Sequence, residues 1–442
     1  MKKKLRIGCG AGFSGDRLQP SVDLIKEGQL DYLVLECLAE RTIALAQKRK
    51  LADPTKGYDA LLESRIRTLL PSLVQNKTRL ITNMGAANPL AAGYKIIEIA
   101  KELSYNISVA VLTGDDVLNY ITLNQDKLST LETNQLLSEY DIVSANAYLG
   151  YDGILEGLKT NADIIITGRV ADPSLFLAPM IYEFNWMEDD WNLLGQGTII
   201  GHLLECAGQV TGGYFADPVM KPVENLSRLG HPIAQIDPEG NLILSKIEGS
   251  GGTINSMTVK EQLLYEVINP SEYFTPDVIA NFTTVRIRQT PDENIMVDGG
   301  TGKIKPPKLK VSIGYKAGYI GEGEISYAGA NAYGRAELAA QIVKDRLSDK
   351  IRKIQIDYIG YDSLHKNNNL VRPIPYEVRL RIAGMTDELE IAELIGNEIE
   401  ALYTNGPAAG GGVRKYTQQV IGIVSTLIDR NMVSPKITLL SI

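Results

Sequence analysis

A glycine-rich stretch near the start of the chain is the first candidate for ligand chemistry. GAGFSG, residues 10–15, has the spacing G-x-G-x-x-G and follows the apolar run LRIGCG. In dinucleotide-binding proteins this spacing lets backbone amides approach a pyrophosphate, and an acidic residue at the end of the next strand binds the ribose. Glu36 stands at that position. The spacing therefore raises the hypothesis of a nucleotide site.

Pro20 argues against the standard NAD or FAD arrangement. It places the expected start of the first helix near Ser21, so that GDRLQ forms a longer irregular loop. The helix amides then lie too far from the glycines to complete a pyrophosphate cradle. A tight turn that needs glycine, or an anion loop for a carboxylate, phosphate or CoA, is favoured over NAD. The residues of such an anion or cofactor loop are Gly10, Gly12, Ser14, Gly15, Arg17 and Glu36.

Arginine, asparagine and glycine residues follow several expected strands, where they are placed to bind a substrate. Arg169 comes directly after ADIIITG and precedes the helix start at Asp172–Pro173, and Arg is the preferred bidentate partner of a carboxylate or phosphate. We expect Arg169 to anchor substrate, with an ion pair to Asp172 or Glu40 as the structural alternative. The predicted substrate-binding residues are Arg41, Asn83, Gly85, Asn88, Asn146 and Arg169.

Three carboxylates are candidates for proton transfer: Glu40, Glu205 and Asp172. Glu205 lies in HLLECAGQVTGGYF, on an expected buried helix, where a carboxylate is costly unless it is paired. It is therefore either part of a structural pair or a tuned acid/base. Asp172 is also expected to cap the helix that begins at Pro173. No cluster demands a metal, although Asp115 and Asp116 with Glu36 offer carboxylates for Mg²⁺.

Alternating strands and helices must position these residues. Short apolar runs predict strands over 5–10, 31–36, 79–83, 107–113, 141–146 and 162–168. Helical patterns fall between them, at 40–50, 91–103 and 150–160. Ligands of an open α/β sheet bind beyond the carboxyl ends of its strands, so we expect one site on that rim.

The change of pattern after residue 216 predicts two domains. Residues 1–216 are expected to form a Rossmann-like α/β domain, with a mostly parallel sheet and helices on both faces. Residues 217–442 are expected to form an α+β domain whose first half is rich in strands, because turn signals such as PEGN and DGGTGK separate short apolar runs.

Composition excludes several classes of protein. The 442 residues carry a net charge of -8, which argues against a nucleic-acid partner. No apolar run approaches the ~20 residues that span a bilayer, so we expect no membrane association. The odd, widely spaced Cys9, Cys37 and Cys206 indicate neither disulfides nor a zinc site, and predict a cytoplasmic protein. With three histidines in all, a His-based triad is poorly supported.

Several blocks together resemble a known family. GAGFSGDR, LECLAERT, NMGAANP, TGRVADPSLF, GHLLECAGQVTGGYF and GVRKYTQQ are similar to the acyclic terpene utilisation protein AtuA family, over essentially the whole chain. The resemblance implies a catabolic enzyme of carboxylic acids or their CoA thioesters, and assigns no residue a catalytic role. Longer members carry a small C-terminal ferredoxin-fold domain, and we expect this chain not to include it. We therefore expect a homo-oligomer and a small ferredoxin-fold subunit as a partner.

These inferences converge on an enzyme of the hydratase or lyase type that acts on a branched unsaturated acid or acyl-CoA. Such chemistry needs an anion anchor, a polarised carbonyl and a carboxylate that moves a proton. CoA enters as part of the substrate, and no cofactor is identified. Two alternatives remain open: a nucleotide- or NAD-dependent enzyme that uses GAGFSG, and a non-catalytic binding or assembly subunit of a two-component enzyme.

Overall fold

The short apolar runs of the first half of the chain form the centre of one large sheet. The computed structural model describes residues 2–290, 294–351, 353–366 and 373–442. Five of the six expected strands lie side by side in it, all parallel. In spatial order they are β1 (Leu5–Ala11), β2 (Tyr32–Leu35), β3 (Arg79–Thr82), β6 (Ile164–Ile166) and β4 (Ser108–Thr113). The α/β class is confirmed, and the Rossmann-like parallel sheet is confirmed for these five strands.

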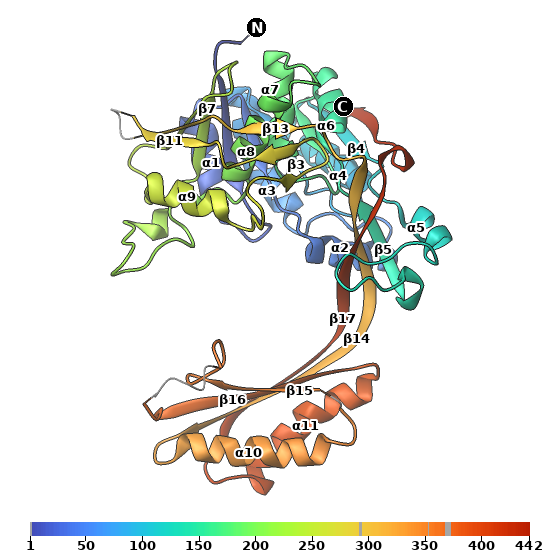
Figure 1. The fold of residues 1–442 in the computed structure, drawn as a ribbon, viewed down its shortest axis with the longest axis vertical. Coiled ribbons are helices and arrows are strands. Elements are labelled where there is room, and N and C mark those ends of the chain that lie inside the picture. The colour runs from blue at the N-terminus through green and yellow to red at the C-terminus, as the bar shows by residue number, and fades with distance from the viewer. Residues whose placement is uncertain (1, 291–293, 352, 367–372) are drawn as a thin grey trace. The chain divides into compact units, whose positions relative to one another are not determined.

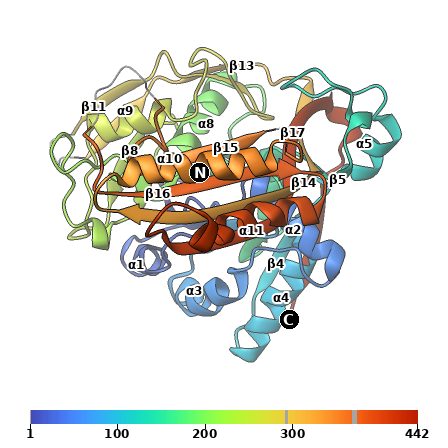
Figure 2. The ribbon, with the colours of Figure 1, turned by 90° about the horizontal axis from the view of Figure 1, so that it is seen from below.

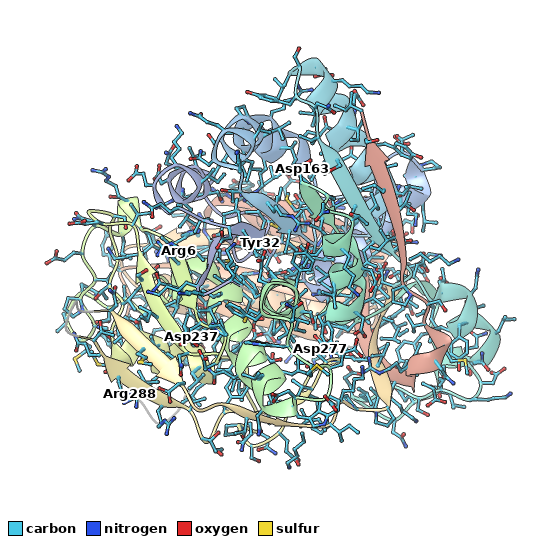
Figure 3. The ribbon with its side chains drawn as sticks, turned by 90° about the horizontal axis from the view of Figure 1, so that it is seen from above. Arg6, Tyr32, Asp163, Asp237, Asp277 and Arg288 are labelled. Carbon is cyan, nitrogen blue, oxygen red and sulfur yellow. The ribbon has the colours of Figure 1, made fainter. Side chains whose placement is uncertain are left out.

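Both flanks of this sheet are antiparallel, which departs from the mostly parallel sheet that we expected. Beyond β1 follow β7 (Pro232–Ile236), β8 (Leu242–Lys246), β12 (Ile295–Asp298) and β11 (Arg286–Gln289), and beyond β4 lies β18 (Lys436–Ser441). Seen from above, Tyr32 of β2 lies near the middle of this part and Arg288 of β11 at its margin (Figure 3). β7 and β8 form a hairpin, which needs only a short turn between its strands. The sequence predicts such a hairpin but does not indicate which sheet it extends.

The strand expected at 141–146 forms but does not join the parallel strands. It is β5 (Ile142–Ala147), and it pairs with β14 (Lys308–Ala328). Burial does not distinguish it, because four of its six residues are buried, as in β4. Its partner β14 lies far along the chain, so no local pattern indicates this pairing. The expected six-stranded parallel sheet is corrected to five.

Helices cover both faces of the parallel strands, as predicted. α1 (Gln19–Glu27), α3 (Leu62–Asn76) and α4 (Pro89–Glu102) share one apolar core with the sheet. α6 (Tyr151–Lys159), α7 (Ser174–Phe184) and α8 (Trp191–Glu205) share the other. Figure 2 shows α1, α3 and α4 together along one side. The remaining elements of this part are α2 (Glu40–Ala52), α5 (Leu118–Asn124), α9 (Ser256–Leu264), β9 (Tyr273–Phe274), β10 (Ile279–Asn281) and β13 (Thr301–Lys303).

Asp277 connects the starts of two of these helices. Its carboxylate accepts a hydrogen bond from the Tyr151 N–H of α6 at 2.9 Å and from the Ser174 hydroxyl of α7 at 2.5 Å. Figure 3 labels this buried residue. Asp277 therefore links the second half of the chain to α6 and α7, two of the helices that cover the first sheet.

The chain divides into two compact units, and the division does not follow the expected domains. One unit comprises residues up to 314 together with 423–442, and the other comprises 315–422 (Figure 1). The boundary expected between residues 216 and 217 falls inside the first unit. It does so because β7, β8, β11 and β12 all follow residue 216 and complete the sheet of the N-terminal half.

The unit 315–422 has the β-α-β-β-α-β order of a ferredoxin-like fold. Its elements are the second part of β14, α10 (Ala332–Leu347), β15 (Ile354–Ile359), β16 (Glu377–Thr386), α11 (Leu389–Asn405) and the first part of β17 (Gly411–Asp429). The strands lie in the order β15-β16-β14-β17, and both helices cover the same face (Figure 2). We expected such a fold only in a separate subunit, yet this chain contains one.

None of the described helices is both long and apolar enough to cross a membrane.

Candidate functional site

The glycine loop after β1 packs tightly against the end of α8. The pairing of β1 with β2 shifts register between Cys9 and Ala11, and the loop then passes the helix end. A Cβ on Gly12 would lie 2.4 Å from the Cys206 carbonyl carbon and 2.8 Å from the Ala207 nitrogen. These neighbours are backbone atoms and cannot swing away. Gly12 is therefore required by packing, whatever else the loop does.

Protein groups occupy several polar atoms of this loop. The Gly12 N–H donates to the Asp16 carboxylate at 2.6 Å. The buried Arg65 guanidinium donates to the Ser14 and Asp16 carbonyls at 2.9 and 2.7 Å. Arg17 donates to the carbonyls of 226 and 227. α1 begins at Gln19, two residues earlier than expected, with Pro20 in its first turn. The contacts favour the tight-turn interpretation over an open cradle.

Glu36 is likewise engaged inside the protein. Its carboxylate accepts hydrogen bonds from the Leu38 N–H at 2.9 Å and from the Asn83 side-chain amide at 2.8 Å. Only 7% of the residue is exposed. Burial, followed by the nearby Asp172 carboxylate, raises the pKa of Glu36 well above its usual value, against the opposing effect of Arg169. A ribose-binding role is not what this geometry favours.

The ends of β3, β4 and β6 lie together, and the end of β5 reaches them from outside the parallel strands. Asp115 after β4 accepts hydrogen bonds from the Asn146 amide at 2.9 Å and from the Arg169 N–H at 3.0 Å. Gly85 fits directly against the backbone after β6, because a Cβ there would lie 2.4 Å from the Thr167 oxygen. Asn83, Gly85, Asn146 and Arg169 therefore belong to one buried cluster.

Arg169 is held by protein acceptors, whereas we expected an open substrate anchor. Its guanidinium donates to the Leu38 carbonyl at 2.5 Å, to the Val170 carbonyl at 2.5 and 2.8 Å, and to Asp172 in an ion pair. It also lies over the Tyr148 ring, 4.5 Å from the centroid, and is 1% exposed. Asp172 uses its carboxylate in this pair and does not cap α7, whose N-cap is Pro173.

Three predicted residues lie outside the buried cluster. Glu40 accepts hydrogen bonds from the Tyr148 hydroxyl at 2.9 Å and the Lys310 ammonium at 2.6 Å. Burial raises the pKa of Glu40, but Lys310 and Tyr148 outweigh it and lower the pKa overall. Arg41 is exposed on α2. Asn88 caps α4 and donates to the carbonyls of 54 and 56, a structural arrangement.

Glu205 lies at the last turn of α8 in a pair with His202. Glu205 Oε1 is 2.8 Å from His202 Nδ1, and His202 Nε2 is 2.9 Å from the Gln262 carbonyl oxygen. The side chains are 11% and 2% exposed. Glu205 Oε2 is buried and has no hydrogen-bond partner. Burial raises the pKa of Glu205 to about 7, although His202 opposes the shift.

The contacts of His202 determine where the protons can be. A carbonyl oxygen only accepts hydrogen bonds, so Nε2 must carry a hydrogen. Nδ1 then either accepts a hydrogen bond from protonated Glu205 or, in an imidazolium, donates one to its carboxylate. Both arrangements hold one proton between the two side chains. A buried carboxylate whose pKa is raised to about 7 is suited to general acid–base chemistry.

The comparisons with known proteins identify the family. The family model described as acyclic terpene utilisation family protein AtuA matches residues 5–439. The chain belongs to the AtuA family. A search of curated proteins and a search of solved structures each found no match. The family name assigns this AtuA protein a catabolic role in acyclic terpene utilisation, in agreement with the resemblance that the sequence blocks indicated.

Sequence reasoning missed two members of the candidate site of this AtuA protein. His202 was set aside because histidines are few, although the spacing H-x-x-E puts it on the same helix face as Glu205. Gln262 contacts His202 from α9, 60 residues away, and no local pattern indicates that contact. Among the described residues, no group of three or more His, Cys, Asp or Glu side chains is arranged to hold a metal ion.

Proposed function

We propose that this AtuA protein adds water to, or eliminates it from, a branched unsaturated carboxylic acid or acyl-CoA, with Glu205 as the general acid/base. The observation that carries the proposal is that Glu205 Oε2 is buried and has no hydrogen-bond partner in the protein. The pKa of this carboxyl, which burial raises to about 7, supports it. An unpartnered buried acceptor is costly, so it fits a group that meets water or substrate there.

The reaction follows from the two protonation states of this carboxylate. In the hydration direction, ionised Glu205 accepts a proton from water while the water oxygen bonds to the β-carbon. The C=C electrons move toward the carbonyl and form an enolate. Protonated Glu205 then returns a proton to the α-carbon, which completes the addition of one water molecule. A pKa of about 7 supplies both states at neutral pH, and dehydration runs through the same steps in reverse.

Arg169 then serves as a positioning residue and does not bind substrate itself. Its hydrogen bonds fix the backbone at 38 and 170 and hold Asp172 on the rim between β2 and α7. Asn83 and Asn146 hold Glu36 and Asp115 in the same way. Asp172 also lies close enough to Glu205 for its charge to contribute to the raised pKa of Glu205.

Location and association belong to the same proposal. The three cysteines are free thiols, in agreement with a reducing compartment, and we place the reaction in the cytoplasm. We also propose a homo-oligomer, which light scattering on the purified protein tests. The ferredoxin-like unit within the chain removes the reason for expecting a separate small partner of that fold.

The test is isotope incorporation from labelled water. The protein is incubated in H₂¹⁸O with branched α,β-unsaturated acids, their CoA thioesters and the corresponding 3-hydroxy compounds, and products are analysed by mass spectrometry. We expect ¹⁸O in the hydroxy product, and loss of this activity in Glu205→Gln with the fold retained. A compound that binds but never gains ¹⁸O would indicate a binding subunit, and hydride transfer to added NAD would support the nucleotide alternative.

A further inference from the structure

A cavity lies near the Glu205–His202 pair and is connected to it through Gln262, which lines the cavity and contacts His202. It has a volume of about 310 Å³ and lies between α9 and the segment that follows α8. Its apolar wall includes Tyr214, Phe215, Leu264 and Tyr265, and Gln262 also lines it. Ligand sites of this size commonly combine an apolar lining with a few placed polar groups.

Gln262 connects this cavity to His202 through both ends of the residue. Its side-chain N–H donates to the His202 carbonyl at 3.1 Å, and its own carbonyl meets His202 Nε2 at 2.9 Å. These contacts fix which side-chain atom is the nitrogen, because the His202 carbonyl needs a donor. The remaining atom, Oε1, has no hydrogen-bond partner, although the residue is only 2% exposed. Gln262 Oε1 is therefore a buried hydrogen-bond acceptor that no protein donor satisfies.

Tyr214 marks the outer wall of the cavity. Its backbone φ is +60°, a conformation that costs free energy in a residue with a side chain, and 87% of the residue is exposed. The ring meets Tyr265 edge to face, with 6.1 Å between centroids. Strain and exposed aromatic surface together at a cavity mouth are typical of a ligand-binding position rather than of a packed core.

We propose that this cavity binds the aliphatic chain of a hydroxylated acyl substrate, and that Gln262 Oε1 accepts a hydrogen bond from its hydroxyl group. This inference rests on the proposed function and names the form of the substrate that the site recognises. The cavity holds about ten water volumes at ~30 Å³ each, so a chain with about ten non-hydrogen atoms fits. The unsaturated form lacks the hydroxyl and leaves Oε1 without a donor.

Titration calorimetry with octanoate and 3-hydroxyoctanoate tests the proposal without requiring turnover. We expect the wild-type protein to bind the hydroxy acid at least fivefold more tightly, since otherwise a buried acceptor stays unpaired. Gln262→Met removes the acceptor and should bring the two affinities within twofold. Gln209→Met is the matched control, because it replaces another glutamine of the same cavity and should keep the preference.

The chain-binding part of the proposal has its own variant. Tyr265→Ala should weaken both acids by the same factor, because it removes apolar wall and leaves Gln262 in place. Equal wild-type affinities for the two acids, no binding of either at millimolar concentration, or a preference that survives Gln262→Met would each overturn the inference. A hydroxyl preference without ¹⁸O incorporation would keep this inference and reject hydration. Hydration without the preference would reject this inference alone.

Discussion

At the scale of single residues, the state of one proton between Glu205 and His202 governs the proposed chemistry. The carboxylate is desolvated at the end of α8, and the imidazole lowers its pKa only in part. The same pair explains why a helix that is otherwise apolar and buried contains a carboxylate at all.

Replacing His202 should move the pH dependence of the reaction in a defined direction. His202 lowers the pKa of Glu205 through its charge and its hydrogen bond, so His202→Asn should raise it. Water addition needs ionised Glu205, so kcat/KM in the wild type should rise with pH, with a midpoint near 7. In His202→Asn this midpoint should move to higher pH. Rates of water addition measured from pH 5 to 9 in both proteins check this. An unchanged midpoint would show that another group titrates.

Arg169→Lys should act on stability before it acts on binding. Lysine keeps the positive charge but cannot reach three backbone and side-chain acceptors with a planar fork. Because charged hydrogen bonds contribute roughly 1.5–3 kcal/mol each, we expect the free energy of unfolding to fall by about 2 kcal/mol or more. Chemical unfolding with a parallel measurement of octanoate affinity checks this. Unchanged stability with weakened binding would restore the substrate-anchor interpretation.

At the scale of elements, local sequence patterns predicted the ranges of strands and helices. They did not predict the contacts between segments that are far apart in the chain. The strands and helices of the first half lie close to their expected ranges, because apolar runs and caps are local signals. The positions of Asn83 and Arg169 were predictable because β3 and β6 are neighbouring parallel strands that end on one rim. Asn146 reaches this rim from β5, which lies outside the parallel strands. The partner of β5 and the contact of Gln262 with His202 depend on residues far along the chain, so sequence spacing does not indicate them.

The glycine loop gives a test that separates packing from nucleotide binding. Gly12→Ala should lower the melting temperature with no nucleotide present, because the new Cβ meets the backbone of Cys206 and Ala207. Overpacking of this kind costs about 1–3 kcal/mol. Gly157→Ala, in α6, is the control, since its Cβ meets neighbours at an ordinary 3.4 Å and alanine favours a helix. A stable Gly12→Ala protein would contradict the packing role.

At the scale of the whole molecule, the chain consists of a sheet-centred unit and a ferredoxin-like unit, each with its own apolar core. The sequence did not reveal this division, because the first unit is closed by β18 from the far end of the chain. The continuous strands β14 and β17 belong partly to each unit. The boundary between the units lies inside β14 and β17. The sequence therefore has no linker rich in Gly, Pro or polar residues that would mark it.

A substitution in the core of one unit should therefore leave the backbone amides of the other unit protected from hydrogen exchange. Ile382→Ala truncates a fully buried side chain of the ferredoxin-like core, which typically costs about 2–5 kcal/mol. Hydrogen exchange should rise across 315–422 and stay unchanged in β1, β2 and β3. Ile165→Ala, in the centre of the first sheet, should give the reverse pattern. Increased exchange throughout both units in either variant would contradict two separate cores.

The most direct measurement of the central claim is an infrared titration of Glu205, taken as the difference between the wild type and Glu205→Gln. It needs no substrate, and the subtraction removes the other buried carboxyls, among them Asp115 and Asp277. We predict a protonated carboxyl band that disappears with a midpoint within about one pH unit of 7, because burial disfavours the ionised form. A carboxylate that stays ionised down to pH 5 would contradict the assignment of Glu205 as the general acid/base.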